Sequence, residues 1–275
     1  MDESDLDAIE EISRASTAAD GAEPLDEGAW RRLRHHGDDL DVRVEKDAGF
    51  TVVDGDLLHL VVAPSHREQG YGDRLLDAAL GEREGAWLAW SHGDHPAAAA
   101  LARRTGFERV RELWVMRRSL SGLSATPGAD GGSFELRSFR VGDEAELLRV
   151  NAAAFAHHPE QGGMDAVELT ERMAEPWFDP AGLLVADSGD RLLGFHWTKV
   201  HSAEVGEVYV VGISPAAQGS GLGKLLTLTG LHHLADQGVA EVLLYVESDN
   251  APAVSVYSGL GFGHADSDTH VMYRR

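Results

Sequence analysis

The sequence of 275 residues contains no cysteine. Disulfide bonds, thiolate zinc sites and a cysteine nucleophile are therefore excluded, and with them any mechanism that carries an acyl group on a protein thiol. No stretch approaches the roughly 18 to 20 uninterrupted apolar residues that a membrane-spanning helix needs. Residues 1–16 are acidic and amphipathic, unlike a signal or transit peptide, so we expect a soluble cytoplasmic protein.

Positive charge is also scarce: 24 lysines and arginines stand against 46 aspartates and glutamates, and the formal net charge is −22. Nucleic acids and anionic membranes select for Lys and Arg patches, so we expect neither as a partner. The paired histidines at 35–36, 157–158 and 232–233 point apart on a helix or strand. We therefore expect no metal site.

A stretch rich in Ser, Gly and Pro, "SLSGLSATPGADGGS" at 119–133, divides the chain near its middle. We expect one domain over 1–120, a linker over 121–133 and a second domain over 134–275. Both halves alternate helix-like and strand-like segments, which indicates an α/β (α+β) fold. The expected helices are 3–18, 25–36, 72–82, 96–104, 142–155, 165–175, 220–236 and 250–258. The expected strands are 41–46, 50–54, 57–62, 86–90, 111–118, 134–140, 182–187, 191–200, 205–213, 241–247 and 269–275.

The two halves repeat a glycine-rich turn at a constant separation of 151 residues. The matching pairs are Pro64 and Pro215, Arg67 and Gln218, Gly70 and Gly221, and Gly72 and Gly223. A later "TGF" at 105–107 matches "LGF" at 260–262, at a separation of 155. Chance glycine clusters would not keep such spacing across a strand, a turn and a helix start, so the pattern indicates an internal duplication.

Two familiar phosphate-binding motifs do not fit this turn. A Walker loop needs Ser or Thr after its lysine, but Lys224 is followed by leucine, and a Rossmann fingerprint would need a third glycine at that lysine. The pattern that fits is Q/R-x-x-G-x-G/A between an apolar strand and a helix, as "REQGYG" at 67–72 and "QGSGLG" at 218–223. Glycines let successive backbone N–H groups point at one anion, and the helix dipole adds positive potential there.

This pattern resembles the acyl-CoA signature of the GNAT acyltransferase superfamily in both halves. The resemblance implies two tandem GNAT domains, each a mixed, mostly antiparallel sheet flanked by helices, with acetyl-CoA as co-substrate. In the second half it implies cofactor contacts from a strand end, the turn and a short helix: Val211, Gly212, Ile213, Gln218, Gly219, Ser220, Gly221, Leu222, Gly223, Lys224, Asn250, Ala251, Ala253, Val254 and Ser255. In the first half the corresponding residues are Leu60, Val61, Val62, Arg67, Gln69, Gly70, Tyr71 and Gly72.

Acetyl transfer from a thioester to an amine needs a base for the amine, stabilisation of an oxyanion and an acid for the CoA thiolate. Glu207 lies on the strand before the turn, where it can take the amine proton directly or through a water; the alternative is a solvated strand carboxylate. Tyr257 lies two helical turns after Asn250, so its phenol can reach the CoA sulfur as general acid; the alternative is a core tyrosine.

The first half departs from this pattern. Asp94 lies near the position of the helix-capping asparagine, and Leu101 or Ala102 stands in place of the tyrosine. Asp56 matches the candidate base in spacing. Without a tyrosine, we expect the first half to hold an acyl-CoA but not to turn it over.

The second half shows a closer resemblance, carried by "LLRVNAAAFAHHPEQGG" at 147–163, "LLGFHWTKVH" at 192–201 and "LLYVESDNAPAV" at 243–254. Over most of 134–273 it resembles the mycothiol synthase family, tandem GNAT enzymes of actinobacteria. The resemblance implies an enzyme that acetylates the cysteinyl α-amine of desacetylmycothiol, the last step of mycothiol biosynthesis. It also implies which residues surround the acceptor: Glu27, Glu160, Lys199, Glu207 and Tyr245. We separately expect a monomer, although the sequence does not fix the oligomeric state.

Two alternatives stay open. The first is a tandem GNAT enzyme that acetylates another small amine or a protein N-terminus. The second, from a different class, is a non-catalytic sensor that binds acyl-CoA in both halves. The candidate base and acid of the second half argue against the sensor.

Overall fold

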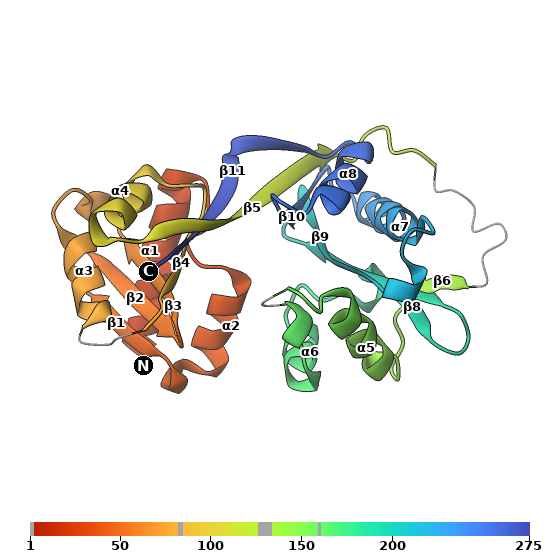
Figure 1. The fold of residues 1–275 in the computed structure, drawn as a ribbon, viewed down its shortest axis with the longest axis horizontal. Helices are drawn as coiled ribbons and strands as arrows, with labels where there is room; N and C mark the ends of the chain where they lie inside the picture. The colour runs from red at the N-terminus through yellow and green to blue at the C-terminus, as the bar shows by residue number, and fades with distance from the viewer. Residues whose placement is uncertain (1–2, 82–84, 126–133, 159–160) are drawn as a thin grey trace. The chain divides into compact units, whose positions relative to one another are not determined.

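The computed structural model describes residues 3–81, 85–125, 134–158 and 161–275 (Figure 1). Most of the expected linker, 126–133, and the acceptor candidate Glu160 lie outside the described residues. The chain divides into two compact units. Unit 1 contains the chain up to Trp114 together with Glu247–Asp249 and Ala265–Arg275, and unit 2 contains Val115–Val246 and Asn250–His264.

Unit 1 is a sheet with helices on both faces. Its strands lie in the order β1-β2-β3-β4-β11. The helices are α1 (Glu3–Asp20), α2 (Glu27–His35), α3 (Tyr71–Leu80) and α4 (Pro96–Thr105), with 3-10 turns η1 (Gly37–Asp39) and η2 (Pro64–His66). The strands are β1 (Asp41–Glu45), β2 (Gly49–Asp54), β3 (Leu57–Val62), β4 (Leu88–Ser91) and parts of β5 (Glu108–Ser119) and β11 (Gly263–Arg274).

Strand alternation creates the two cores of unit 1. Phe50 and Val61 face one side of the sheet, where they belong to an apolar cluster with Ile9 of α1. Leu58 faces the other side and clusters with Leu76 of α3. Both faces are therefore buried, which fixes the register of the antiparallel β2–β3 pair.

Unit 2 has the same plan on a larger scale. Its strands lie in the order β5-β10-β9-β8-β7-β6. The helices are α5 (Glu144–Ala154), α6 (Ala166–Met173), α7 (Leu222–Asp236) and α8 (Ala251–Gly259), with 3-10 turns η3 (Gln161–Gly163), η4 (Pro180–Gly182) and η5 (Pro215–Ala217). The strands are β6 (Glu135–Ser138), β7 (Leu183–Asp187), β8 (Leu192–Val200), β9 (Val205–Ile213) and β10 (Glu241–Glu247), besides the remaining part of β5.

Alternation again assigns each helix of unit 2 to a face of the sheet. Leu183 and Trp197 cluster with Leu147 of α5, whereas Leu184 of the same strand clusters with Leu226 of α7. The antiparallel β8–β9 pair shifts register between Trp197 and Thr198, because β9 carries one extra residue there. On β9 this bulge comes two residues after the candidate base Glu207.

The last strand, β11, begins at Gly263, earlier than the expected 269–275, and most of it belongs to unit 1. Val271–Arg274 pair antiparallel with Leu88–Ser91 of β4. Val271 is fully buried in the same apolar cluster as Leu58 and Trp87. The C-terminal strand therefore completes the sheet of unit 1, although it follows the second half in sequence.

One glycine of α7 can be tested directly. A Cβ at Gly230 would overlap the imidazole of His196, which is fully buried and donates from Nδ1 to Leu226 O over 2.9 Å. We expect Gly230→Ala to lower the free energy of unfolding by about 1–3 kcal/mol despite the better helix propensity of alanine. Gly259→Ala is the matched control, since a Cβ there meets no atom within 4 Å. Urea unfolding of both variants checks this; equal stabilities would contradict it.

Candidate active site

The duplicated turns have the same backbone geometry. Gly70 (φ +81°, ψ 3°) and Gly221 (φ +85°, ψ −3°) are both left-handed N-caps, of α3 and α7. A 3-10 turn of three residues beginning at Pro64 or Pro215 precedes each of them. The separation of 151 residues found in the sequence therefore corresponds to one repeated strand–turn–helix unit.

The first residue of each motif fastens the turn to the preceding strand. Arg67 Nε donates to Val62 O over 3.3 Å, and Gln218 Nε2 donates to Ile213 O over 3.4 Å. In both halves the acceptor is the last residue of the strand. An arginine and a glutamine can exchange at this position because both reach back with an N–H donor.

The turn of unit 2 fits an anionic ligand such as the pyrophosphate of CoA. Gly219, Ser220 and Gly221 are exposed, and a Cβ on either glycine would meet no atom within 4 Å. The first N–H groups of α7 have no partner within the helix, and the helix dipole makes this end positive. Leu222 points into the core, so only its backbone can contribute, whereas Lys224 is exposed beside the turn.

The strand that leads into this turn separates from its parallel neighbour. The parallel pairing joins Val205–Glu207 of β9 to Glu241–Leu243 of β10 and ends there, whereas β9 continues to Ile213. The predicted thioester contacts at 211–213 lie on this continuation. Beyond this fork at Glu207 the two strands therefore no longer pair with each other. Within β9, Gly212 is also needed for packing, since a Cβ there would lie 2.5 Å from Phe195 Cε1.

Glu207 is buried, with a side-chain exposure of 6%. It stands opposite Lys199 in the β8–β9 register, so these two predicted acceptor residues are cross-strand neighbours. Its Oε2 lies 2.7 Å from Nε2 of His201, a residue that the sequence reasoning did not single out. The only signal for it was its position at the end of the "HWTKVH" segment.

Lys199 is surrounded by aromatic rings. Its Nζ lies 4.7 Å from the ring centroid of Trp177 and 5.4 Å from that of Tyr209, and these two rings are 4.9 Å apart. Such contacts hold a cation over the negative ring faces. Neither aromatic residue was predicted. Two further acceptor candidates are described within their own units: Tyr245 is 44% exposed on β10 of unit 2, and Glu27 begins α2 of unit 1, 4.0 Å from Arg31.

The predicted acid is on α8. Asn250 caps this helix, with Oδ1 accepting from Ala253 N over 3.3 Å. Ala251, Ala253, Val254 and Ser255 follow in its first turns, and Tyr257 packs edge-on against Phe262 with ring centroids 6.0 Å apart. Burial raises the pKa of Tyr257 to about 12. Its phenol is therefore protonated throughout the physiological range and can act as a proton donor.

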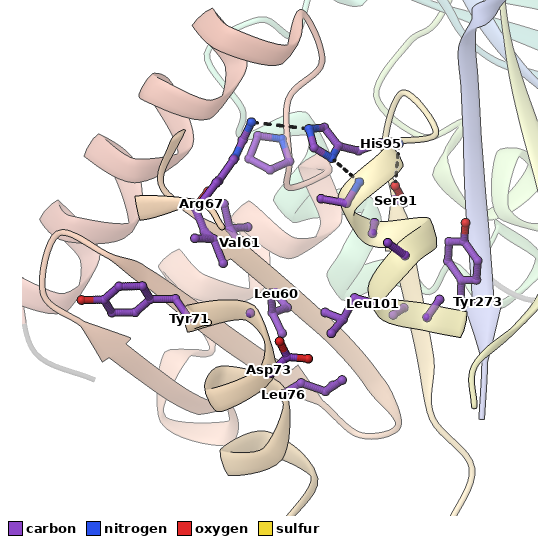
Figure 2. A pocket seen from close by; sticks show the side chains of 18 of the residues that line it. Leu60, Val61, Arg67, Tyr71, Asp73, Leu76, Ser91, His95, Leu101 and Tyr273 are labelled. Carbon is purple, nitrogen blue, oxygen red and sulfur yellow. Dashed lines mark hydrogen bonds between the residues drawn. The ribbon is translucent and has the colours of Figure 1, made fainter. Parts of the chain in front are cut away.

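Unit 1 contains a cavity of about 450 Å³ at the corresponding fork (Figure 2). β3 and β4 pair in parallel only over Leu57–Leu58 and Leu88–Ala89. Seven of the eight predicted first-half cofactor residues line the cavity: Leu60, Val61, Val62, Arg67, Gly70, Tyr71 and Gly72. Gln69 instead donates from its side chain to Ser65 O over 3.1 Å.

Polar groups close one side of this cavity. Arg67 makes a bidentate ion pair with Asp20, both N–O distances being 2.7 Å, and His95 Nε2 lies 3.6 Å from the same carboxylate. The Arg67 guanidinium beside Asp20 lowers the pKa of that carboxyl. In unit 1 the first residue of the turn motif is therefore neutralised by a carboxylate 47 residues away in the sequence.

The structure corrects the sequence-based comparison of the two halves. His95, not Asp94, occupies the cap of α4, where its Nδ1 accepts from Ala97 N over 3.2 Å. Asp56 lies exposed in the tight turn between β2 and β3, whereas the base of unit 2 is buried within a strand. The strands β2 and β3 end on either side of this turn, so the residue that matches Glu207 in spacing cannot lie within a strand. Leu101 lines the cavity, and Ala102 is buried in the core.

Two features are absent from the described residues. No helix among them combines the length and the apolar character needed to cross a membrane. In the same part of the chain, no three His, Asp or Glu side chains converge in a group that could hold a metal ion.

Comparison with known proteins identifies the same superfamily that the two glycine turns resemble. The family described as "Acetyltransferase (GNAT) family" matches residues 151–262, and the "Acetyltransferase (GNAT) domain" matches residues 38–109. A mycothiol acetyltransferase of Nocardioides sp. is 61% identical over 98% of this chain and 97% of its own length. Another, of Nocardia farcinica, is 46% identical over 98% of this chain and 94% of its own. A solved tandem GNAT protein from the clavulanic acid biosynthesis pathway has a TM-score of 0.68 at 18% identity, covering 99% of this chain and 95% of that one.

The fold, the two turns and these matches define the class: an acetyl-CoA-dependent N-acetyltransferase with two GNAT domains. Within this class, the chain belongs to the mycothiol acetyltransferase family. The expected fold class, the tandem GNAT arrangement and acetyl-CoA as co-substrate are thus confirmed.

The raised pKa of Tyr257 predicts a stability change at alkaline pH. The unfolded chain gives up the tyrosine proton near the ordinary pKa of about 10, whereas the folded chain holds it until about 12. Between these values the unfolded state binds fewer protons, so the free energy of unfolding falls as the pH rises. Tyr257→Phe removes this contribution.

Urea unfolding at about pH 8 and about pH 11 measures it. Relative to the variant, the wild type should lose stability between the two pH values. An unchanged difference between the two proteins would show that burial does not perturb this phenol.

Proposed function

We propose that the protein transfers acetyl from acetyl-CoA to the cysteinyl α-amine of desacetylmycothiol, the last step of mycothiol biosynthesis. The observation that carries the proposal is the fork of unit 2, which has a buried carboxylate at its base and an anion-binding turn at its open end. The name of the relatives supports mycothiol as the product class.

In the proposed mechanism the amine attacks the thioester directly. Glu207 takes a proton from the ammonium, directly or through a water, and the nitrogen forms a bond to the carbonyl carbon. The carbonyl electrons move to oxygen, where the backbone of Val211, Gly212 and Ile213 stabilises the charge. When the C–S bond breaks, the thiolate takes the proton of Tyr257, which regains one from the nitrogen. The products are the amide, CoA and one proton that remains on the glutamate.

The acceptor is proposed to lie on the base side of the fork. Lys199 and the hydroxyl of Tyr245 are suited to the sugar and inositol hydroxyls, and Glu207 attracts the ammonium. Glu27 and Glu160 complete the proposed set as further hydroxyl-binding carboxylates. An α-amine with an ordinary pKa of about 7.7–8.0 is partly neutral near pH 7, so a carboxylate is a sufficient base.

Removing the proposed base tests this function. Glu207→Gln keeps the shape but cannot take a proton, so kcat with desacetylmycothiol should fall by about 10²–10⁴-fold while the affinity for acetyl-CoA is unchanged. CoA release measures the rate, and equilibrium titration measures the affinity.

Glu204→Gln is the matched control, since Glu204 is exposed in the turn three residues earlier and should leave kcat unchanged. Full activity of the Glu207 variant would remove the base from the mechanism. If the wild type releases no CoA with desacetylmycothiol but does so with another small amine or a peptide N-terminus, the acceptor assignment is wrong. Release with none of these acceptors would favour a non-catalytic acyl-CoA sensor.

For unit 1 we propose acetyl-CoA binding without turnover. The proposal is supported by the cavity at the β3–β4 fork and by the repeated left-handed glycine cap. Position 56 holds no buried carboxylate and positions 101 and 102 hold no phenol, so the base and acid proposed for unit 2 have no counterparts at the matching positions of this fork.

Calorimetry on the full chain tests this second site. We expect two equivalents of acetyl-CoA for the wild type and one for Leu60→Trp, whose larger side chain fills the cavity that Leu60 lines. The kcat of this variant should be unchanged. A single equivalent bound by the wild type would contradict the proposal.

A further inference from the structure

Each proposed turnover leaves one proton on a buried carboxylate. The ammonium and acetyl-CoA give an amide, neutral CoA and a proton, and the proton first resides on Glu207. With a side-chain exposure of only 6%, this carboxylate has little direct access to solvent. The base must lose the proton before it can act again, so the site needs a route to water.

His201 is placed to provide that route. Its Nε2 lies 2.7 Å from Oε2 of Glu207, which is a short hydrogen bond, while 36% of its own side chain is exposed. One ring nitrogen therefore contacts the buried carboxylate, and the ring also reaches the surface. Histidine is the side chain whose ordinary pKa suits proton exchange near neutral pH.

The hairpin between β8 and β9 fixes this histidine. His201 N donates to Val205 O over 2.9 Å, directly after the last residue of β8. The hydroxyl of Ser202 accepts from the backbone N–H groups of Glu204 and Val205, at 3.2 and 3.1 Å. The turn is therefore held from both sides, and the imidazole reaches six residues along the chain to the base.

We propose that His201 is a positioning residue that orients Glu207 and carries its proton to solvent; this rests on the proposed role of Glu207 as base. The Oε2–H bond of the protonated glutamate breaks as an Nε2–H bond forms on the neutral imidazole. The imidazolium then gives its Nδ1 proton to water or buffer, which leaves the Nε2–H tautomer that donates to the ionised glutamate. When the glutamate is next protonated, exchange with solvent moves the ring proton to Nδ1, so that Nε2 can again accept. No other reactant is needed.

Two substitutions separate the orienting role from the proton transfer. His201→Gln keeps an N–H donor for the carboxylate but cannot take up a proton, whereas His201→Ala removes both functions. In dilute buffer we expect kcat of the glutamine variant to fall about tenfold, with KM for both substrates within about twofold of the wild type. Adding free imidazole should restore most of this loss, and the wild type should respond little.

His35→Gln serves as the control, since His35 is exposed at the end of α2 in unit 1. Wild-type kcat of the His201→Gln variant in dilute buffer would overturn the inference. A loss that free imidazole does not restore would also overturn it, by showing that the histidine is merely structural. Glu207→Gln is assayed in parallel: if that variant is fully active, the proposed base itself has failed, whereas an inactive Glu207→Gln beside a normal His201→Gln contradicts this inference alone.

Discussion

The parallel pairing of β9 and β10 ends after Leu243 and Glu207, and the rest of the candidate site depends on that separation. Paired strands would satisfy each other's backbone groups and leave no space between them. Beyond this point β9 leads into the glycine turn and the positive end of α7, and the proposed acid Tyr257 lies on α8. The carboxylate lies where the strands are still paired, so it is both fixed and buried.

Unit 1 has the same fork but differs where the acceptor side begins. Its β2–β3 hairpin turns at Gly55 and Asp56, whereas β8 and β9 run on and hold Lys199 and Glu207 across from each other. The cofactor side of the duplicated domain is preserved, as the left-handed glycine caps show. The acceptor side is shortened, and the tyrosine position is apolar. The strand–turn–helix unit is therefore kept in both copies, whereas the proposed base and acid, Glu207 and Tyr257, both belong to unit 2.

The sequence predicted the elements and both turns well because these depend on local physics: strand alternation, glycines with positive φ and helix starts. It did not predict contacts between distant segments. The Arg67–Asp20 ion pair joins residues 47 positions apart, and the pairing of Val271 with β4 joins the end of the chain to the first half. The His201–Glu207 contact was missed because it depends on the conformation of the hairpin, which the letters "HSAEVGE" do not specify. The cap of α4 by His95 was likewise not predicted, although Asp94 beside it was placed near that position.

We propose that unit 2 transfers acetyl by direct attack of the amine, with Tyr257 protonating the leaving thiolate. The most direct measurement is the single-turnover rate of CoA release from desacetylmycothiol and acetyl-CoA by Tyr257→Phe, compared with the wild type. We expect a rate at least about 100-fold lower, with the affinity for acetyl-CoA unchanged. An unchanged rate would contradict it.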